Sequence, residues 1–147
     1  MRRKTLIATH GYLARGFKSS AEILAGMGES IIDINAYTDE EPGDYTPKIA
    51  AFIDGVAEDE EGLIFTDLAG GSVNQKVVCT LAERPGGVPA NVFLVTDTNL
   101  MSLIALLLES RDLSADLIDE LLGQTHATRV QLEGVLGACE DEDVFLD

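Results

Sequence analysis

The feature that most constrains this sequence is the regular alternation of short apolar runs with longer amphipathic stretches. Four runs are short and almost wholly apolar: residues 5–9, 31–36, 63–66 and 92–96. Strands that are covered on both faces have this character, because neither face meets water. Helical stretches between successive strands are typical of βαβ units. The sequence therefore predicts an α/β protein with a doubly wound parallel sheet.

Apolar residues recur at helical spacing in residues 17–28, 44–59, 72–84, 99–110 and 114–124. In the second of these segments Thr46 is the expected N-cap, with Pro47 at the first helical position. Residues 99–110 are apolar nearly all round, which predicts a buried helix or one in an interface. Residues 125–135 remain open, because they could continue as a helix or form an edge strand in which Thr128, Val130 and Leu132 alternate with polar residues.

The chain of 147 residues is long enough for one domain, which we expect at residues 1–139, before an acidic tail at 140–147. Its 26 acidic and 10 basic residues give a net charge of −16, which argues against nucleic acid and anionic membranes as partners. The apolar segment at residues 6–8 is too short for a signal peptide or a membrane span, so a cytoplasmic protein is expected. Cys79 and Cys139 lack metal-ligand spacing and are expected to be reduced, packed thiols.

Polar side chains follow three of the expected strands, as His10 with Gly11, as Asp67 and as Asp97. In an open parallel sheet, ligands bind beyond the carboxyl ends of the strands, where the strand order reverses. A flavodoxin-like order of 2-1-3-4 makes the first and third strands neighbours. His10 and Asp67 are then expected to face each other at this position.

The segment after Asp67 has the sequence "LAGGSVNQ". Gly70 and Gly71 can adopt positive φ angles that direct successive N–H groups into one concavity, and Ser72 can cap the next helix. A helix N-terminus attracts anions, so this loop is a candidate cradle for an oxyanion or a phosphoryl group. Glycines after a strand also occur in ordinary tight loops, but here they coincide with a histidine and a carboxylate.

The stretches "THGYLARGFKSSAEILAG", "GLIFTDLAGGSVNQ" and "TDTNL" together resemble the IIA component of the mannose-family sugar phosphotransferase system. The resemblance covers about residues 4–135. It implies that His10 is the phosphorylated histidine, that Asp67 hydrogen-bonds its ring, and that Gly70, Gly71 and Ser72 hold the phosphoryl group. The sequence departs from the family pattern at three positions, where it has Val73, Gln75 and Met101.

This resemblance implies a phosphoryl carrier that accepts phosphate from the histidine-containing phosphocarrier protein and passes it to a IIB component for sugar uptake. The family also implies a homodimer, with residues 125–135 as the candidate for a C-terminal strand exchanged between subunits. The chemistry of the residues agrees, because a carboxylate that accepts from one ring N–H selects the tautomer and stabilises positive charge on the ring. No cofactor or metal is required.

Two alternative functions remain. One is a regulatory module in which the same phosphohistidine is not coupled to transport. The other is a metal-dependent hydrolase with His10, Asp67, Asp97 and His126 as ligands, although the sequence has no characteristic ligand spacing. A helix-capping role is the favoured interpretation of Asp97, and an exposed or packing role that of His126. Arg15 could contact phosphate or a partner, or begin a helix.

Overall fold

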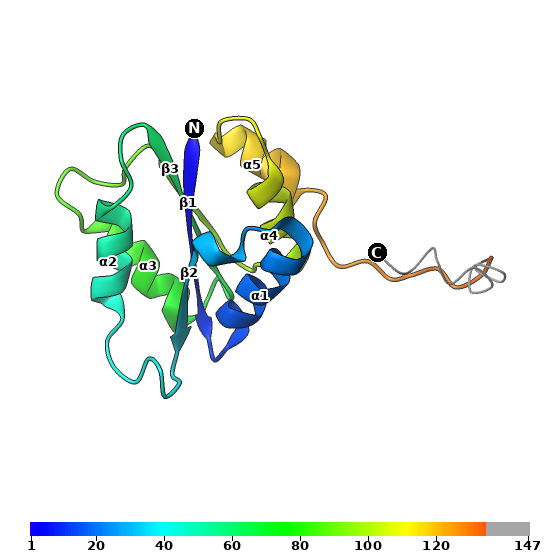
Figure 1. Ribbon diagram of the computed structural model, residues 1–147, viewed down its shortest axis with the longest axis horizontal. Coiled ribbons are helices and arrows are strands. Elements are labelled where there is room, and N and C mark those ends of the chain that lie inside the picture. The colour runs from blue at the N-terminus through cyan, green and yellow to red at the C-terminus, as the bar shows by residue number, and fades with distance from the viewer. Residues whose placement is uncertain (135–147) are drawn as a thin grey trace.

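The computed structural model describes residues 1–134, which form a four-stranded sheet with helices on both faces (Figure 1). The strands are β1 (Arg2–His10), β2 (Ile31–Ala36), β3 (Glu60–Thr66) and β4 (Val92–Val95). The helices are α1 (Leu13–Ala25), the short 3₁₀ helix η1 (Gly28–Ser30), α2 (Thr46–Asp54), α3 (Ser72–Ala82), α4 (Leu100–Leu108) and α5 (Ala115–Leu122). Neighbouring strands are parallel in the order β2-β1-β3-β4. The predicted fold class and strand order are confirmed.

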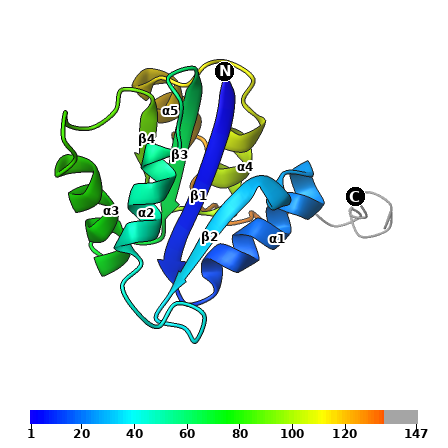
Figure 2. The same ribbon diagram turned by 60° about the vertical axis from the view of Figure 1, so that its left-hand side comes forward.

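The sheet separates two helical layers (Figure 2), and each layer forms its own buried core with the sheet. Helices α2 and α3 cover one face, where Phe52 and Val77 pack with Leu6 of β1. Helices α1, α4 and α5 cover the other face, where Leu103 packs with Ile7. Adjacent residues of β1 thus enter opposite cores, as the period of a strand requires. Both faces of the central strands are buried, which explains their continuous apolar runs.

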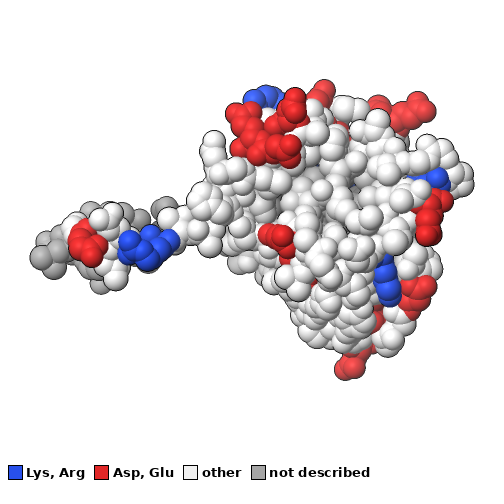
Figure 3. Space-filling model, turned by 180° about the vertical axis from the view of Figure 1, so that it is seen from behind, with Lys and Arg blue, Asp and Glu red and all other residues white. Residues whose placement is uncertain are grey.

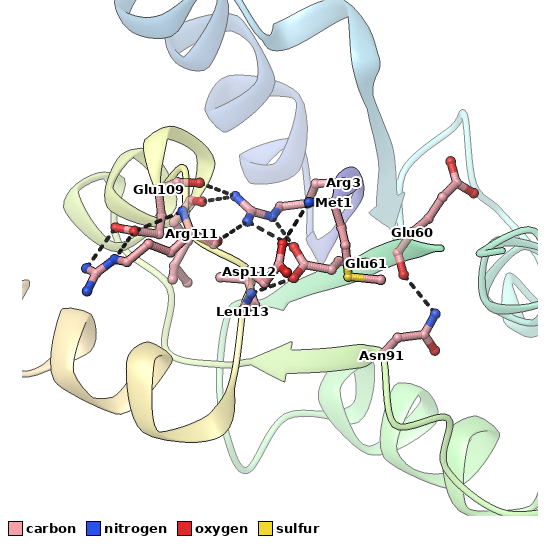
Figure 4. A network of polar contacts seen from close by, with 10 residues as sticks. Met1, Arg3, Glu60, Glu61, Asn91, Glu109, Arg111, Asp112 and Leu113 are labelled. Atoms are coloured by element: carbon pink, nitrogen blue, oxygen red, sulfur yellow. Dashed lines mark hydrogen bonds and ion pairs between the residues drawn. The ribbon is translucent and has the colours of Figure 1, made fainter. Parts of the chain in front are cut away.

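Ion pairs lie at the amino end of the sheet, and Figure 4 shows the pair of Arg3 with Glu61. At this end β1 and β3 begin earlier than predicted. Arg2 lies 2.7 Å from Glu60, and Arg3 lies 2.9 Å from Glu61, across the paired strands. Both glutamates are only 2% exposed, so they do not belong to the solvated acidic surface. Glu61 also accepts a hydrogen bond from the amide of Leu113, which links β3 to the segment before α5. Elsewhere acidic side chains are widely distributed over the surface, as the face in Figure 3 shows.

Two helices begin at positions other than those predicted. Helix α1 begins at Leu13 instead of residue 17, because side chains of two strands satisfy its first amides. Thr9 Oγ1 accepts from the amide of Ala14 at 2.8 Å, and Asn35 Oδ1 accepts from that of Arg15 at 3.1 Å. Thr46 is the first residue of α2 and not its N-cap. The carboxylate of Asp44 accepts the hydrogen bond from the Thr46 amide at 2.9 Å.

Residues 125–134 follow α5 as a segment without helix or strand, and they lead away from the packed body (Figure 1). Neither alternative for these residues is therefore found in the single chain. An exchanged strand requires a second subunit and stays a prediction. The expected acidic tail at 140–147 and Cys139 lie outside the described residues. Cys79 is a free thiol, but it is exposed and not packed as expected. Within residues 1–134 no helix is both long and apolar enough to cross a membrane.

Candidate functional site

His10 is the last residue of β1, at the carboxyl edge of the sheet. Gly11 follows with a φ of +62°, a conformation that glycine adopts without strain, and its amide donates to the carbonyl of Ala36 at 2.9 Å. The chain therefore turns away immediately after the histidine into α1. The side chain of His10 is 40% exposed, which leaves it accessible to a ligand or a protein partner.

The structure brings His10 and Asp67 together, as the strand order predicted. Oδ2 of Asp67 accepts one hydrogen bond from the main-chain amide of His10 and lies 2.8 Å from Nδ1 of its ring. The other carboxylate oxygen accepts from the amide of Leu68 at 3.0 Å. An ionised carboxylate only accepts hydrogen bonds, so this contact favours the tautomer with its proton on Nδ1. Nε2 is then left with a free electron pair.

The same contacts set the ionisation of Asp67, whose side chain is only 8% exposed. Burial is the largest single influence and by itself raises the pKa, but hydrogen bonds from the amide and the ring of His10 outweigh it. The pKa of Asp67 is consequently lowered from its usual value. Asp67 is therefore a carboxylate near neutral pH, suited to hold a protonated Nδ1 and to stabilise positive charge on the ring.

The expected positive φ angles at Gly70 and Gly71 are wrong. Gly71 has a φ of −82° and a ψ of 158°, the extended conformation of a residue that precedes a helix. Its small size is needed for another reason, because a Cβ atom there would lie 3.1 Å from Cε1 of His10 and 3.2 Å from the carbonyl oxygen of Leu68. The loop passes directly against the imidazole ring. A Cβ atom at Gly70 would meet nothing within 4 Å.

The amide of Gly71 donates to the carbonyl of Leu68 at 2.9 Å, so it is not free to bind a phosphoryl oxygen as expected. Ser72 is the first residue of α3 and not its cap. The amides in the first turn of a helix lack intrahelical partners, which leaves that of Ser72 available to an anion. Asn74 holds the loop in place, since its side chain accepts from Thr66 Oγ1 at 2.7 Å and donates to the carbonyl of Ala69 at 3.1 Å.

Asp97 supports this loop, and its predicted role as a helix cap is wrong. Its Oδ1 accepts from the amide of Ala69 at 2.9 Å, and its backbone has a φ of +51°. The N-cap of α4 is Asn99, whose side chain accepts from the amide of Ser102 at 2.8 Å. Oγ of Ser102 in turn accepts from the amide of Asn99 at 3.1 Å, so the two residues form a capping box.

Tyr37, which directly follows β2, lies at the site although it was not among the predicted site residues. Its ring centroid lies 5.4 Å from that of His10, and its hydroxyl lies 2.5 Å from Oγ of Ser72. Its backbone φ of +65° is unusual for a residue with a large side chain. In the sequence Tyr37 is marked only by its position, because it directly follows β2 and β2 ends beside β1.

The remaining candidates do not join His10. Arg15 pairs with Glu40 and lies 3.5 Å from Asp33, on the neighbouring strand β2. His126 lines a separate hollow of about 380 Å³ together with Asp97 and Asn99. Within residues 1–134, no three or more His, Cys, Asp or Glu side chains form a group that could hold a metal ion.

Comparison with known proteins assigns the family. Residues 4–105 match the family described as the fructose IIA component of the PTS, the sugar phosphotransferase system, and the chain therefore belongs to it. The chain is similar to a phosphoenolpyruvate-dependent sugar phosphotransferase system permease from Klebsiella pneumoniae, with 31% identity and a TM-score of 0.68 over 84% of this chain and 85% of that one. The family resemblance seen in the sequence is confirmed.

Two further solved structures have related folds. One is phosphotransferase system component EIIA from Streptococcus agalactiae, with 25% identity and a TM-score of 0.62 over 82% of this chain and 90% of the other. The second is the mannose/sorbose-specific IIA subunit from Enterococcus faecalis, with 23% identity and a TM-score of 0.66 over 90% and 97% of the two chains. Comparison with curated protein sequences gives no significant match.

Proposed function

We propose that this chain is a phosphoryl carrier of the sugar phosphotransferase system, in which His10 is the phosphorylated residue. The observation that carries the proposal is the double contact of Asp67 with the amide and Nδ1 of His10. Membership in the IIA family is consistent with it. The incoming phosphoryl group would come from a phosphohistidine on the histidine-containing phosphocarrier protein. The phosphoryl group would then be transferred to a IIB component that serves sugar uptake.

The chemistry follows from the tautomer. Nε2 of His10 attacks phosphorus with its electron pair and forms the new N–P bond, while the N–P bond of the donor breaks and its electrons return to the donor ring. The proton on Nδ1 stays in place, so the phosphorylated ring carries positive charge beside the Asp67 carboxylate. Transfer onward to the IIB component reverses these steps. Catalysis in this account comes from positioning and electrostatics.

The phosphoryl oxygens would lie against the loop before α3. Ser72 supplies a hydroxyl and an amide in the first turn of α3. This N-terminal end of the helix favours negative charge. Gly71 contributes by keeping this loop free of a side chain beside the imidazole ring, whereas a Cβ atom at Gly70 would meet nothing within 4 Å. The Gly71 amide, which already donates to Leu68, is not part of this set.

Exposed apolar side chains near His10 favour a protein as donor and acceptor. Leu13 follows β1, and Leu68 follows β3, and both are more exposed than is usual for leucine. They lie at the same edge of the sheet as the histidine. A IIA component of this kind would work in the cytoplasm, where both of its partners can reach it.

We also propose a homodimer whose domain extends to residue 139 and includes the exchanged C-terminal segment. β4 is an edge strand in the single chain, and an added strand can cover its free edge. Val130 and Leu132 are 65% and 70% exposed, so an interface would bury them. Light scattering should give twice the chain mass of 15.7 kDa, and a chain that ends at Gln124 should be monomeric. A monomeric full-length chain would contradict the dimer.

The carrier function is tested with phosphoenolpyruvate, enzyme I and the phosphocarrier protein. The wild-type chain should gain one acid-labile phosphoryl group, and His10→Ala should gain none while it keeps its fold. His126→Ala is the matched control and should be phosphorylated like wild type. Phosphorylation of the His10→Ala chain on His126 would contradict the proposal.

A further inference from the structure

Tyr37 has a backbone conformation that its residue type does not favour. Its φ is +65°, and Asp97 is the one other non-glycine residue with positive φ in the described part of the chain. Each directly follows, or nearly follows, a strand that ends at the edge where His10 lies. Such strained residues persist only where the surrounding structure fixes them, and they concentrate at functional sites.

The loop that carries Tyr37 is anchored at several points. Thr38 Oγ1 donates to the carbonyl of Asn35 at 2.7 Å, and the amide of Glu41 donates to the carbonyl of Thr38 at 3.1 Å. Two ion pairs also connect the loop to helices. Glu40 pairs with Arg15 of α1, and Glu41 pairs with Lys48 of α2. Tyr37 is therefore held in its position by the loop.

Burial does not explain why the loop holds a tyrosine there, since Tyr37 is 61% exposed. Its side chain instead reaches from the imidazole ring of His10 to the hydroxyl of Ser72. The two rings are tilted by 34° at a centroid distance of 5.4 Å, and the two hydroxyl oxygens lie 2.5 Å apart. Tyr37 thus contacts both the proposed phosphoryl acceptor and a proposed ligand of the phosphoryl group.

A second phenol lies near the first. Tyr45 is 1% exposed, and its hydroxyl has no hydrogen-bond partner among residues 1–134. Burial, and then the nearby Tyr37, raise the pKa of Tyr45, which keeps that hydroxyl protonated. A protonated hydroxyl group therefore lies near the side chain of Tyr37.

We propose that Tyr37 is a positioning residue of the phosphoryl site, which donates its hydroxyl proton to Oγ of Ser72. This bond occupies an electron pair of Oγ and leaves the Ser72 proton free to point at a phosphoryl oxygen on His10. The Tyr37 ring at the same time limits the movement of the imidazole. The role rests on the proposed function, since it requires a phosphoryl group on His10.

The test is the rate of phosphoryl transfer from the phosphorylated carrier protein to wild type, Tyr37→Phe, Ser72→Ala and the double variant. Loss of one oriented hydrogen bond should lower kcat about five- to tenfold in Tyr37→Phe, with KM unchanged. Because Tyr37 acts through Ser72, the double variant should be no slower than Ser72→Ala. A wild-type rate in Tyr37→Phe, or a full further loss in the double variant, would overturn the role of Tyr37 alone.

Tyr37→Asn separates this role from a structural one. Asparagine tolerates positive φ, so the melting temperature should rise, by about 2 to 4 °C, while kcat falls. A variant that loses stability and activity together would indicate that Tyr37 only supports the loop. A wild-type chain that accepts no phosphoryl group would overturn the proposed function and, with it, the role of Tyr37.

Discussion

The main-chain amide and the ring Nδ1 of His10 both lie 2.8 Å from one oxygen of Asp67, Oδ2. A single atom therefore fixes the end of β1 and the orientation of the imidazole. The ring cannot turn over without losing its bond to the carboxylate. In the proposed reaction this relationship determines which nitrogen receives phosphorus.

Asp67→Asn should separate catalysis from stability. The asparagine can present its amide protons to the imidazole and favour the wrong tautomer, so phosphoryl transfer should slow by about 10² to 10⁴. The free energy of unfolding should fall by only about 1–3 kcal/mol, the cost of the altered hydrogen bonds. Transfer at the wild-type rate, measured with the phosphorylated carrier protein, would show that Asp67 does not set the tautomer.

Asp67 should also make stability depend on pH in acid. Its pKa is lowered in the folded chain, so its contribution to stability is complete above the unfolded value of about 3.9 and is lost as pH falls through the folded value. Urea midpoints of wild type and Asp67→Asn should therefore differ more at about pH 5 than at about pH 2. A difference that is the same at both pH values would contradict the lowered pKa.

Gly71→Ala tests the close approach of the loop to His10. The added Cβ would lie 3.1 Å from Cε1 of the ring, so it should displace the imidazole and lower phosphoryl transfer by about tenfold or more. Gly70→Ala is the matched control, because its Cβ would meet nothing within 4 Å and the rate should be retained. Equal rates for the two variants would show that the contact has no role in catalysis.

Asp97→Ala tests the support that the segment after β4 gives to the same loop. The variant leaves the amide of Ala69 without its acceptor and should lower both phosphoryl transfer and stability, the latter by about 1 kcal/mol. Asp97→Asn keeps an acceptor oxygen and tolerates the positive φ, so it should behave nearly as wild type. If Asp97→Ala melts and transfers like wild type, the bond to Ala69 does not hold the loop.

The order of the elements was predictable because hydrophobic periodicity is a local property of the sequence. Short apolar runs located the strands, and the strand order then brought His10 and Asp67 to one edge. The predicted start of α1 was wrong because Thr9 and Asn35, from two different strands, accept hydrogen bonds from its first amides. The polar first residues of β1 and β3 were not predicted for a similar reason. Arg2 and Arg3 pair with glutamates at a sequence separation of 58.

The candidate site was predicted in its central pair but not in the geometry of its loops. Glycine at position 71 was attributed to positive φ, whereas the structure requires it because the ring of His10 lies against it. The only sign of Tyr37 in the sequence is its position directly after a strand, because its contacts with His10 and Ser72 depend on tertiary structure. Asp97 could have been separated from the cap of α4 by the spacing of Asn99 and Ser102, which is that of a capping box.

The measurement that tests the central claim most directly is NMR of the phosphorylated, ¹⁵N-labelled chain, with long-range proton–nitrogen correlations to identify the nitrogen bonded to phosphorus. Asp67 holds Nδ1, so the account predicts a single phosphohistidine, at Nε2 of His10, with the proton of Nδ1 retained toward the carboxylate. Phosphorus on Nδ1 of His10, or on either nitrogen of His126, would contradict it.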